Sequence, residues 1–443
     1  MTGGARRPEL DAIRLVVVLG LVFFHSGLVF DERDDFYVKN AQTTEAITWV
    51  AGLGVVWAMP ALFLIAGLGS WHSLGRRGTG GFVRERLLRL GVPLVFATLT
   101  IVPVPQWLRL RSADPGYDES YPRFLLRFFD VHLSLSNFPF LVRGEDFETG
   151  HLWFVVLLLA FSLMLALVAR WLPAARLSFV SRRGVFLILP AIPLVVIGAL
   201  LGMEEAFAGW SRWAYLLFFL YGFVLAGDDH FRTAMRRDAK PAAIIGFVLF
   251  GASGLLLGTA DGEPFTDLTA HAVAARIVFA AAGWCWLVAI LGLLDRGPRP
   301  TGPATSDRDS PEPGAATSDG RPREPEPVAS EHRPREPEPA TSDRTIREPA
   351  ASDRAPREPG PVIGEPPPRK RRPVLAYLAA AALPLYILHQ PIVVTVAYFA
   401  VQWSAPMAVK FLAIVVLSFA IMFAVHDLLV RRTAVTRFLF GMR

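Results

Sequence analysis

The stretch LDAIRLVVVLGLVFFHSGLVF spans residues 10–30, and its apolar residues are interrupted by Asp11, Arg14 and His25. A helix needs about 20 predominantly apolar residues to cross the hydrocarbon core of a bilayer, and this stretch is long enough. It ends without the small-residue pattern of a signal-peptide cleavage site, so we expect it to stay attached. The sequence therefore predicts a first transmembrane helix over residues 11–30 that carries ionisable side chains.

Similar apolar runs recur along the chain, which is 53% apolar and only 19% charged. Soluble globular domains average about 45–50% apolar and about 25% charged residues, so this composition indicates a protein that crosses the membrane many times. We predict an all-α integral membrane fold with about ten transmembrane helices. The predicted helices cover residues 11–30, 47–71, 91–107, 151–172, 185–203, 210–227, 241–260, 270–294, 373–401 and 407–430.

Lysine and arginine in the short loops set the predicted orientation, because cytoplasmic loops are enriched in both. Basic residues precede the first and ninth helices and follow the second, fourth, sixth and tenth, whereas Glu204, Glu205 and residues 261–267 lie in loops without them. Both termini are therefore predicted to be cytoplasmic, in a multi-pass protein of the cell (plasma) membrane. The net charge of +6 does not indicate nucleic-acid binding, because the basic residues flank apolar segments.

Residues 297–368 differ in composition from the rest of the chain, since they are rich in proline, glutamate and arginine and poor in large apolar residues. Such a segment buries too little surface to offset chain entropy, so we predict a disordered cytoplasmic linker. It divides a membrane domain at residues 1–296, with helices one to eight, from residues 369–443, with helices nine and ten and a short tail. A plain tether is the favoured interpretation, and regulatory docking is the alternative.

Arg14 and His25 are separated by eleven residues on the first predicted helix. At about 100° and 1.5 Å per residue, they lie on one helix face and about 16 Å apart along it. Ionisable groups inside a membrane usually face a cavity and mark function. Asp11 precedes Arg14 by three residues and can pair with it, and a histidine suits a general base. A donor with anionic phosphates at one end and a reactive thioester at the other, such as coenzyme A, suits that separation.

The segment from Arg7 to Arg14, followed by His25, resembles the opening of acyltransferase family 3, whose multi-helix members O-acetylate bacterial surface glycans. Other segments resemble family patterns in the same order, and together they span most of the membrane part. These are residues 63–68 (FLIAGL), the Arg-x-x-Arg pattern of Arg86 and Arg89, residues 150–154 (GHLWF) and residues 385–389 (LYILH). Ala66 replaces the serine of the family segment, so a serine nucleophile is excluded there.

The resemblance implies transfer of an acyl group, most simply acetyl, from cytoplasmic acyl-CoA to a hydroxyl of a glycan, glycolipid or glycosylated metabolite. It implies that Arg14, Arg86 and Arg89 bind the donor phosphates, that Asp11 orients Arg14, and that His25 is the general base or accepts the acyl group transiently. His389 is a weaker fourth candidate. Acyl-CoA is then a donor substrate, the bilayer and the acceptor are the other partners, and no spacing of potential ligands indicates a metal.

Several alternatives remain open at this stage. Arg14 can be an interfacial anchor and His25 a hydrogen-bonding residue between helices, and the whole chain can be a transporter or flippase for an acylated or glycosidic compound. A glucan succinyltransferase is a third possibility. His389 precedes Gln390 and Pro391, where a proline frees a backbone carbonyl, so a capping role competes with a catalytic one. His151 is expected to be an interfacial residue.

Overall fold

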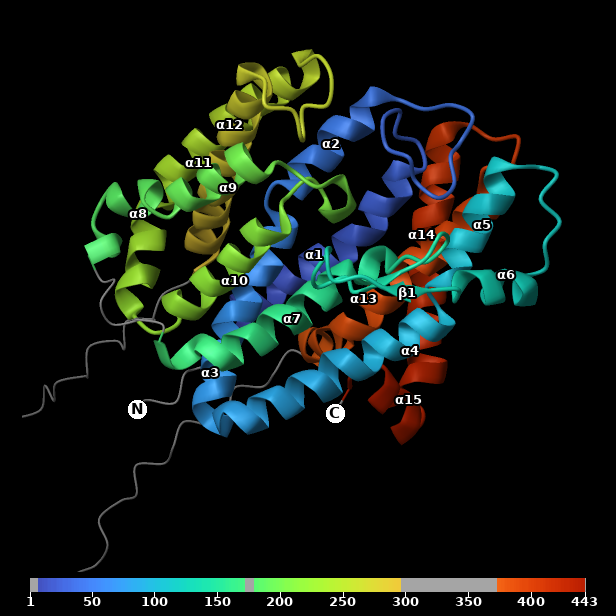
Figure 1. The fold of residues 1–443 in the computed structure, drawn as a ribbon, viewed down its shortest axis with the longest axis horizontal. Helices are drawn as coiled ribbons and strands as arrows, with labels where there is room; N and C mark the ends of the chain where they lie inside the picture. Colours follow the sequence, from blue (N-terminus) through green and yellow to red (C-terminus); the bar gives the residue numbers. More distant parts are fainter. Residues whose placement is uncertain (1–6, 172–178, 296–372, 443) are drawn as a thin grey trace, which may run out of the picture. The chain divides into compact units, whose positions relative to one another are not determined.

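The computed structural model describes residues 7–171, 179–295 and 373–442, and these form an almost wholly helical body (Figure 1). The one sheet in these ranges consists of two short strands. The elements are α1 (Pro8–Leu28), α2 (Glu45–Val55), α3 (Ala58–Arg86), η1 (Leu87–Gly91), α4 (Val92–Thr100), α5 (Pro103–Ala113), α6 (Tyr121–Phe128), β1 (His132–Leu133), β2 (Val142–Arg143), η2 (Gly150–Leu152), α7 (Trp153–Val168), η3 (Ala169–Trp171), α8 (Val185–Ile188), α9 (Ala191–Leu201), η5 (Glu205–Phe207), α10 (Arg212–Leu225), α11 (Asp229–Thr259), α12 (Ala270–Leu294), α13 (Pro373–Ala400), α14 (Met407–Val425), η6 (His426–Val430) and α15 (Ala434–Leu439).

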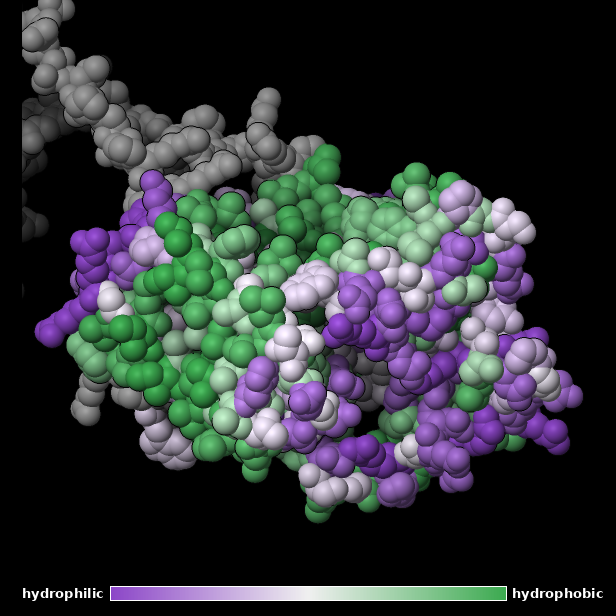
Figure 2. Space-filling view, turned by 90° about the horizontal axis from the view of Figure 1, so that it is seen from above, coloured by the Kyte–Doolittle hydropathy of each residue, from purple (hydrophilic) through white to green (hydrophobic). Residues whose placement is uncertain are grey.

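Seven helical stretches within the described residues are long and apolar enough to cross a membrane. One of these stretches, Glu45–Ala113, joins the elements from α2 to α5. Many large apolar side chains on the outer helices are exposed, such as Phe247 and Leu255 on α11 and Leu412 on α14, and Figure 2 shows hydrophobic residues gathered over one part of the surface. The all-α membrane fold is thereby confirmed. The count of ten helices and the cytoplasmic side of both termini stay predictions, and the linker prediction lies outside the described residues.

Prolines break two of the predicted helices. The run predicted at 47–71 is divided between α2 and α3 just before Pro60, and the run at 91–107 is divided between α4 and α5 just before Pro103. A proline lacks the N–H that would bond the carbonyl four residues earlier, so the helical hydrogen bonds are interrupted ahead of Pro60 and Pro103, which lie in the first turns of α3 and α5. The predicted single helices were wrong at these two points.

Two segments that the sequence placed in cytoplasmic loops are helical. Helix α3 continues to Arg86, with a kink at Gly78, and α11 begins at Asp229 instead of near residue 241. The Asp228 side chain caps α11 by accepting a hydrogen bond from the backbone N–H of His230 at 2.9 Å. Arginine, alanine and lysine are good helix formers, so a basic loop with an N-cap residue extends the neighbouring helix.

Helices α3 and α10 pack backbone against backbone through two glycines. A Cβ atom on Gly67 would lie 2.0 Å from the Phe219 carbonyl oxygen, and one on Gly222 would lie 1.9 Å from the Leu64 carbonyl oxygen. Small residues allow this close approach of membrane helices. The contact fixes the part of α3 before the kink at Gly78 against α10.

Both ends of the described chain lie at the end of the body that carries Arg14, Arg86 and Arg89, which we call the arginine-rich end. Near the start of α1, Glu9 pairs with Arg7 at 3.0 Å and lies 3.8 Å from Arg232 of α11, which also binds Asp295 at the end of α12. At the other terminus, a Cβ on Gly441 would lie 2.6 Å from the Arg89 carbonyl oxygen. Helix α1 runs from this end through the body, packed against α13 and α14, towards loops at the opposite end (Figure 1).

Candidate active site

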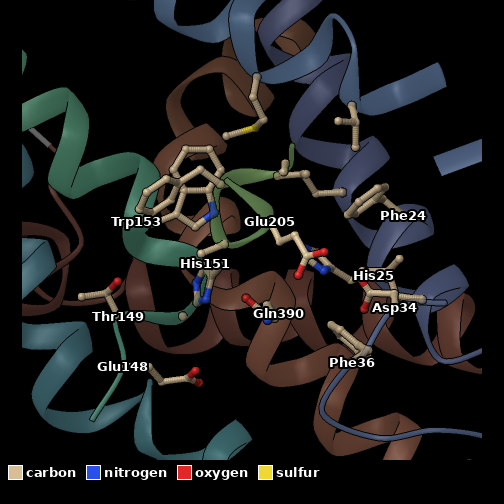
Figure 3. Close-up of a pocket in the computed structure, with 18 of the residues that line it drawn as sticks. Phe24, His25, Asp34, Phe36, Glu148, Thr149, His151, Trp153, Glu205 and Gln390 are labelled. Carbon is tan, nitrogen blue, oxygen red and sulfur yellow. The ribbon is translucent and has the colours of Figure 1, made fainter. Parts of the chain in front are cut away.

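A cavity of about 670 Å³ lies at the His25 end of α1, opposite the arginine-rich end. Its walls come from α1, α13, η2 and the loops that follow α1, β2 and α9, and Figure 3 shows side chains from these elements converging on it. This volume lies within the range of small-molecule sites, about 300–1,000 Å³, and an apolar lining with a few converging polar groups is also typical of such sites.

One face of α1 forms a wall of the cavity. The lining residues on α1 run from Val16 and Val17 through Leu21 to His25 and Leu28. Arg14 precedes Val17 by three residues, so it continues the same face about one turn further towards the arginine-rich end. The cavity therefore follows the helix from His25 for most of the distance to Arg14.

Three histidines from three different elements meet at the inner wall. The ring centroids of His25 on α1 and His389 on α13 are 5.1 Å apart, and those of His389 and His151 on η2 are 5.0 Å apart. His389 is 1% exposed, whereas His25 is only partly buried and faces the cavity. The structure thus brings together His25 and His389, which the resemblance singled out, and adds His151.

His151 is not the interfacial residue that we expected, because it is only 6% exposed. Its Nε2 lies 2.9 Å from the backbone oxygen of Ile387, to which it donates. Pro391 lacks the N–H that would bond this carbonyl in a regular helix, so the proline creates the acceptor that holds His151. The capping role that the sequence left open for His389 is performed by His151.

The hydrogen bonds of His389 define which of its nitrogens carries the proton in the neutral ring. Nδ1 lies 2.5 Å from the backbone oxygen of Tyr386, and a carbonyl only accepts, so Nδ1 carries the hydrogen. Nε2 then holds the lone pair, and it is buried without a hydrogen-bond partner, as is Nδ1 of His25. The two buried nitrogens belong to neighbouring rings, which leaves Nε2 of His25 as the atom available to the cavity.

Carboxylates also line the cavity. The Tyr37 hydroxyl donates to Glu148, and Arg109 pairs with Asp35. Burial raises the pKa of Glu148 and, together with the Glu148 carboxylate, that of Tyr37. The first contact holds Tyr37 against the segment before η2, and the second holds Asp35 against α5.

Asp34 faces the cavity from the loop after α1. Its backbone N–H donates to the buried Asp31 carboxylate at 3.1 Å, and its backbone oxygen accepts from Lys39 at 2.8 Å. Burial in the cavity wall, reinforced by Asp31, Asp35 and Glu205 and opposed by Lys39, raises the pKa of the Asp34 carboxyl to about 6.

The arginines named by the sequence form a second cluster, at the other end of α1. Arg14 donates to the Ile65 carbonyl at 3.2 Å and pairs with Asp11 at 3.4 Å. Arg86 donates to the Ser70 hydroxyl at 3.0 Å, its Nε is buried without a partner, and it lies within electrostatic range of Arg14 and Arg89. The structure therefore brings these arginines and Asp11 together and separates them from the histidines.

Sequence reasoning missed several residues of the cavity, namely His151, Tyr37, Glu148, Asp34, Glu205 and Gln390. Only His151 had a signal, because it lies within the GHLWF segment that carries the resemblance. Asp34, Tyr37 and Glu148 come from loops, Glu205 from η5 and Gln390 from α13, and their contacts depend on the tertiary fold. Within the described ranges, no group of three or more potential ligands could hold a metal ion.

A family model described as an acyltransferase domain matches residues 7–301 of the 443-residue chain. The chain belongs to this acyltransferase family. The match includes Arg14, His25, Arg86 and His151, and it ends before His389. No curated protein and no solved structure matches the chain. The protein is therefore a multi-pass membrane acyltransferase that transfers groups other than amino-acyl groups, and membership favours an enzyme over a transporter.

Proposed function

We propose that this acyltransferase moves an acyl group, most simply acetyl, from cytoplasmic acyl-CoA to a hydroxyl of a glycan, a glycolipid or a glycosylated metabolite at the cell membrane. One observation carries the proposal. A single face of α1 bears His25 at the inner wall of a large cavity and Arg14, about one turn beyond that wall, within an arginine cluster. A thioester donor with a charged head and a long arm matches this arrangement.

The arginine cluster is the proposed site for the donor phosphates. Arg14, Arg86 and Arg89 supply guanidinium groups that bind phosphate oxygens in pairs. Asp11 holds one edge of the Arg14 guanidinium, which limits its rotation. The buried, unpartnered Nε of Arg86 is a donor that an anionic ligand would satisfy.

The proposed chemistry takes place at His25. Nε2 of His25 accepts the proton of the acceptor hydroxyl as its oxygen attacks the thioester carbonyl. The carbon–sulfur bond then breaks, the ester is formed, and the proton passes from His25 to the departing coenzyme A thiolate. His389 acts as a positioning residue, because a lone pair on its Nε2 favours the His25 tautomer that keeps its hydrogen on Nδ1.

A second route passes through an acyl-histidine. In that route Nε2 of His25 attacks the thioester carbonyl and the carbon–sulfur bond breaks, so that coenzyme A leaves as the thiolate. The acceptor hydroxyl then attacks the acyl-histidine, the bond from the acyl carbon to Nε2 breaks, and the freed His25 accepts the hydroxyl proton. The two routes differ when the acceptor is left out. Labelled donor then leaves acid-labile label on His25 in the second route and none in the first.

A donor screen tests the proposed function. Purified protein is incubated with acetyl, propionyl and succinyl thioesters and an acceptor extract, and release of coenzyme A is followed with the wild type, His25→Ala and Arg14→Ala. We expect turnover with acetyl-CoA that both substitutions reduce. Absence of binding and turnover with every donor would overturn the proposal, and preference for the succinyl donor would identify a succinyltransferase.

A further inference from the structure

The cavity in front of His25 carries more negative than positive charge. Its lining contains five carboxylates and three arginines. Two arginines are already neutralised, since Arg109 pairs with Asp35 and Arg212 binds Glu204 through both Nε and Nη2, at 3.0 and 2.5 Å. When these two ion pairs of the described residues are set aside, three carboxylates and one arginine remain in the lining. The three carboxylates are Asp34, Glu148 and Glu205, and the arginine is Arg143.

Two cations at or near the cavity, Arg212 and Lys39, are already bound to other groups of the protein. Arg212 also donates to the carbonyls of Asn137 and Phe138 at 3.2 and 3.1 Å, so its guanidinium is committed to joining two loops. The nearby ammonium of Lys39 donates to three backbone carbonyls, those of Leu28, Asp31 and Asp34. Neither cation is available to bind an anionic ligand.

One amide oxygen in the cavity wall is buried without a well-formed hydrogen bond among the described residues. Gln390 is 5% exposed and lines the cavity, where its amide interacts with His151 and Tyr37. Its Oε1 nevertheless makes no hydrogen bond of good geometry within the described residues. Figure 3 shows the Gln390 amide in the cavity wall between the side of His151 and the side of His25. A buried amide oxygen of this kind requires a hydrogen-bond donor, which a hydroxyl or an amino group supplies.

Aromatic rings complete the wall. Phe24, Phe36, Trp57, Phe147 and Trp153 all line the cavity. Aromatic faces bind apolar ring surfaces and also attract cations. The cavity thus combines flat apolar surfaces, acceptor atoms and an excess of negative charge.

Given the proposed function, we propose that this cavity is the acceptor site and that its charge selects sugars that are uncharged or cationic, such as hexosides and amino sugars, and excludes anionic sugars such as uronic acids. A carboxylate on the acceptor would have to approach Asp34, Glu148 and Glu205 in a partly desolvated space, where like charges repel strongly. An amino group would gain a carboxylate partner in the same position.

Charged thiol reagents test the electrostatics of the cavity without knowledge of the natural acceptor. The natural cysteine, Cys285, is buried and is replaced by alanine. Thr149→Cys then places a thiol in the lining, and Ala206→Cys provides a second position there. At each position, the rate of modification by a trimethylammonium methanethiosulfonate is divided by the rate for a sulfonate methanethiosulfonate. This ratio is then divided by the ratio measured at the exposed Ser136→Cys.

We expect the cationic reagent to be favoured about tenfold in the cavity, because negatively lined clefts concentrate cations. Asp34→Asn combined with Glu205→Gln should bring the ratio to within about twofold of the surface value. The matched pair Asp130→Asn and Glu145→Gln changes carboxylates outside the lining and should leave it unaltered. An equal or inverted ratio at both cavity positions, or no reaction at either, would overturn the proposal.

Acyl transfer to matched sugars connects this charge to specificity. Methyl glucoside, methyl glucosaminide and methyl glucuronide are compared as acceptors with the donor that the enzyme uses. We expect kcat/KM for the glucuronide to be about tenfold lower than for the glucoside, and to recover in Asp34→Asn with Glu205→Gln. Efficient use of the glucuronide would contradict charge selection. The expected thiol ratio without transfer to any sugar would instead contradict the proposed function and leave the charge selection standing.

Discussion

The two ends of α1 hold their polar side chains in different ways. At the arginine end, Arg14 is held by Asp11 and the Ile65 carbonyl and Arg86 by Ser70, and Nε of Arg86 is a further donor that is buried without a partner. At the histidine end, Nδ1 of His25 and Nε2 of His389 are buried, which leaves Nε2 of His25 available to a large cavity. A fixed positive charge suits binding of a ligand, whereas an available lone pair suits proton transfer. The difference supports the proposed division of binding and chemistry along one helix.

The largest effect is expected from His25→Ala. Loss of a general base typically lowers the rate by about 10²- to 10⁴-fold, and kcat should fall while KM for the thioester changes little. Steady-state release of coenzyme A measures both constants. His271→Ala, which removes an exposed histidine on α12, serves as the matched control and should behave as the wild type. Activity that persists in His25→Ala would exclude His25 as the base and leave the family assignment intact.

A smaller effect, on KM and not on kcat, is expected from Arg86→Lys. Lysine keeps the positive charge that sets topology but loses the paired donors of the guanidinium, so KM for the thioester should rise about tenfold with little change in kcat. Arg76→Lys, at an exposed position of the same helix, is the control and should leave KM unaltered. Equal effects of the two substitutions would mean that Arg86 has only a topological role.

Pro391→Ala should have a modest effect confined to the histidine end. Alanine restores the N–H that bonds the Ile387 carbonyl, which then competes with His151 for this acceptor. We expect kcat to fall about threefold and KM for the thioester to stay the same, as judged by release of coenzyme A. Pro384→Ala in the same helix does not affect the Ile387 carbonyl that holds His151, so it should retain wild-type kcat. A change in KM without a change in kcat would contradict the division between the two ends.

The smallest expected effect is a pH dependence of the charge in the cavity. The pKa of Asp34 is raised to about 6 by burial and by neighbouring carboxylates, against Lys39, so the charge is present above pH 6 and is lost as the pH falls through 6. The preference of Thr149→Cys for the cationic reagent should therefore decrease between pH 7.5 and 5.5. The same ratio at Ser136→Cys corrects for the thiol itself. In Asp34→Asn the ratio should change much less with pH, and an unaltered pH dependence there would assign it to another group, such as Glu148, whose pKa is also raised by burial.

Helical periodicity was sufficient to predict the common face of Arg14 and His25, because both residues belong to one continuous helix. It could not place His389 beside His25, since that contact depends on how α13 packs against α1. The role of Pro391 was predicted in part, as a freed carbonyl, but the partner of that carbonyl comes from η2. The pairing of Tyr37 with Glu148 joins two loops and left no periodic signal in the sequence.

Helix boundaries were predictable where apolar runs ended at charged loops, as for α12, which matches the predicted 270–294. They were wrong where helix-forming basic residues continued the helix beyond its apolar part, as in α3 and α11. Hydropathy reports which residues contact lipid, whereas the backbone hydrogen bonds continue wherever propensity and capping allow.

Binding of a non-transferable thioether analogue of acetyl-CoA tests the division along α1 most directly. Its affinity is measured by calorimetry with purified wild type, His25→Ala and Arg14→Ala. We expect His25→Ala to bind within about twofold of the wild type, because His25 acts on the proton, and Arg14→Ala to bind at least about tenfold more weakly, because a phosphate partner is lost. Unchanged binding by Arg14→Ala, or loss of binding in His25→Ala alone, would contradict the account.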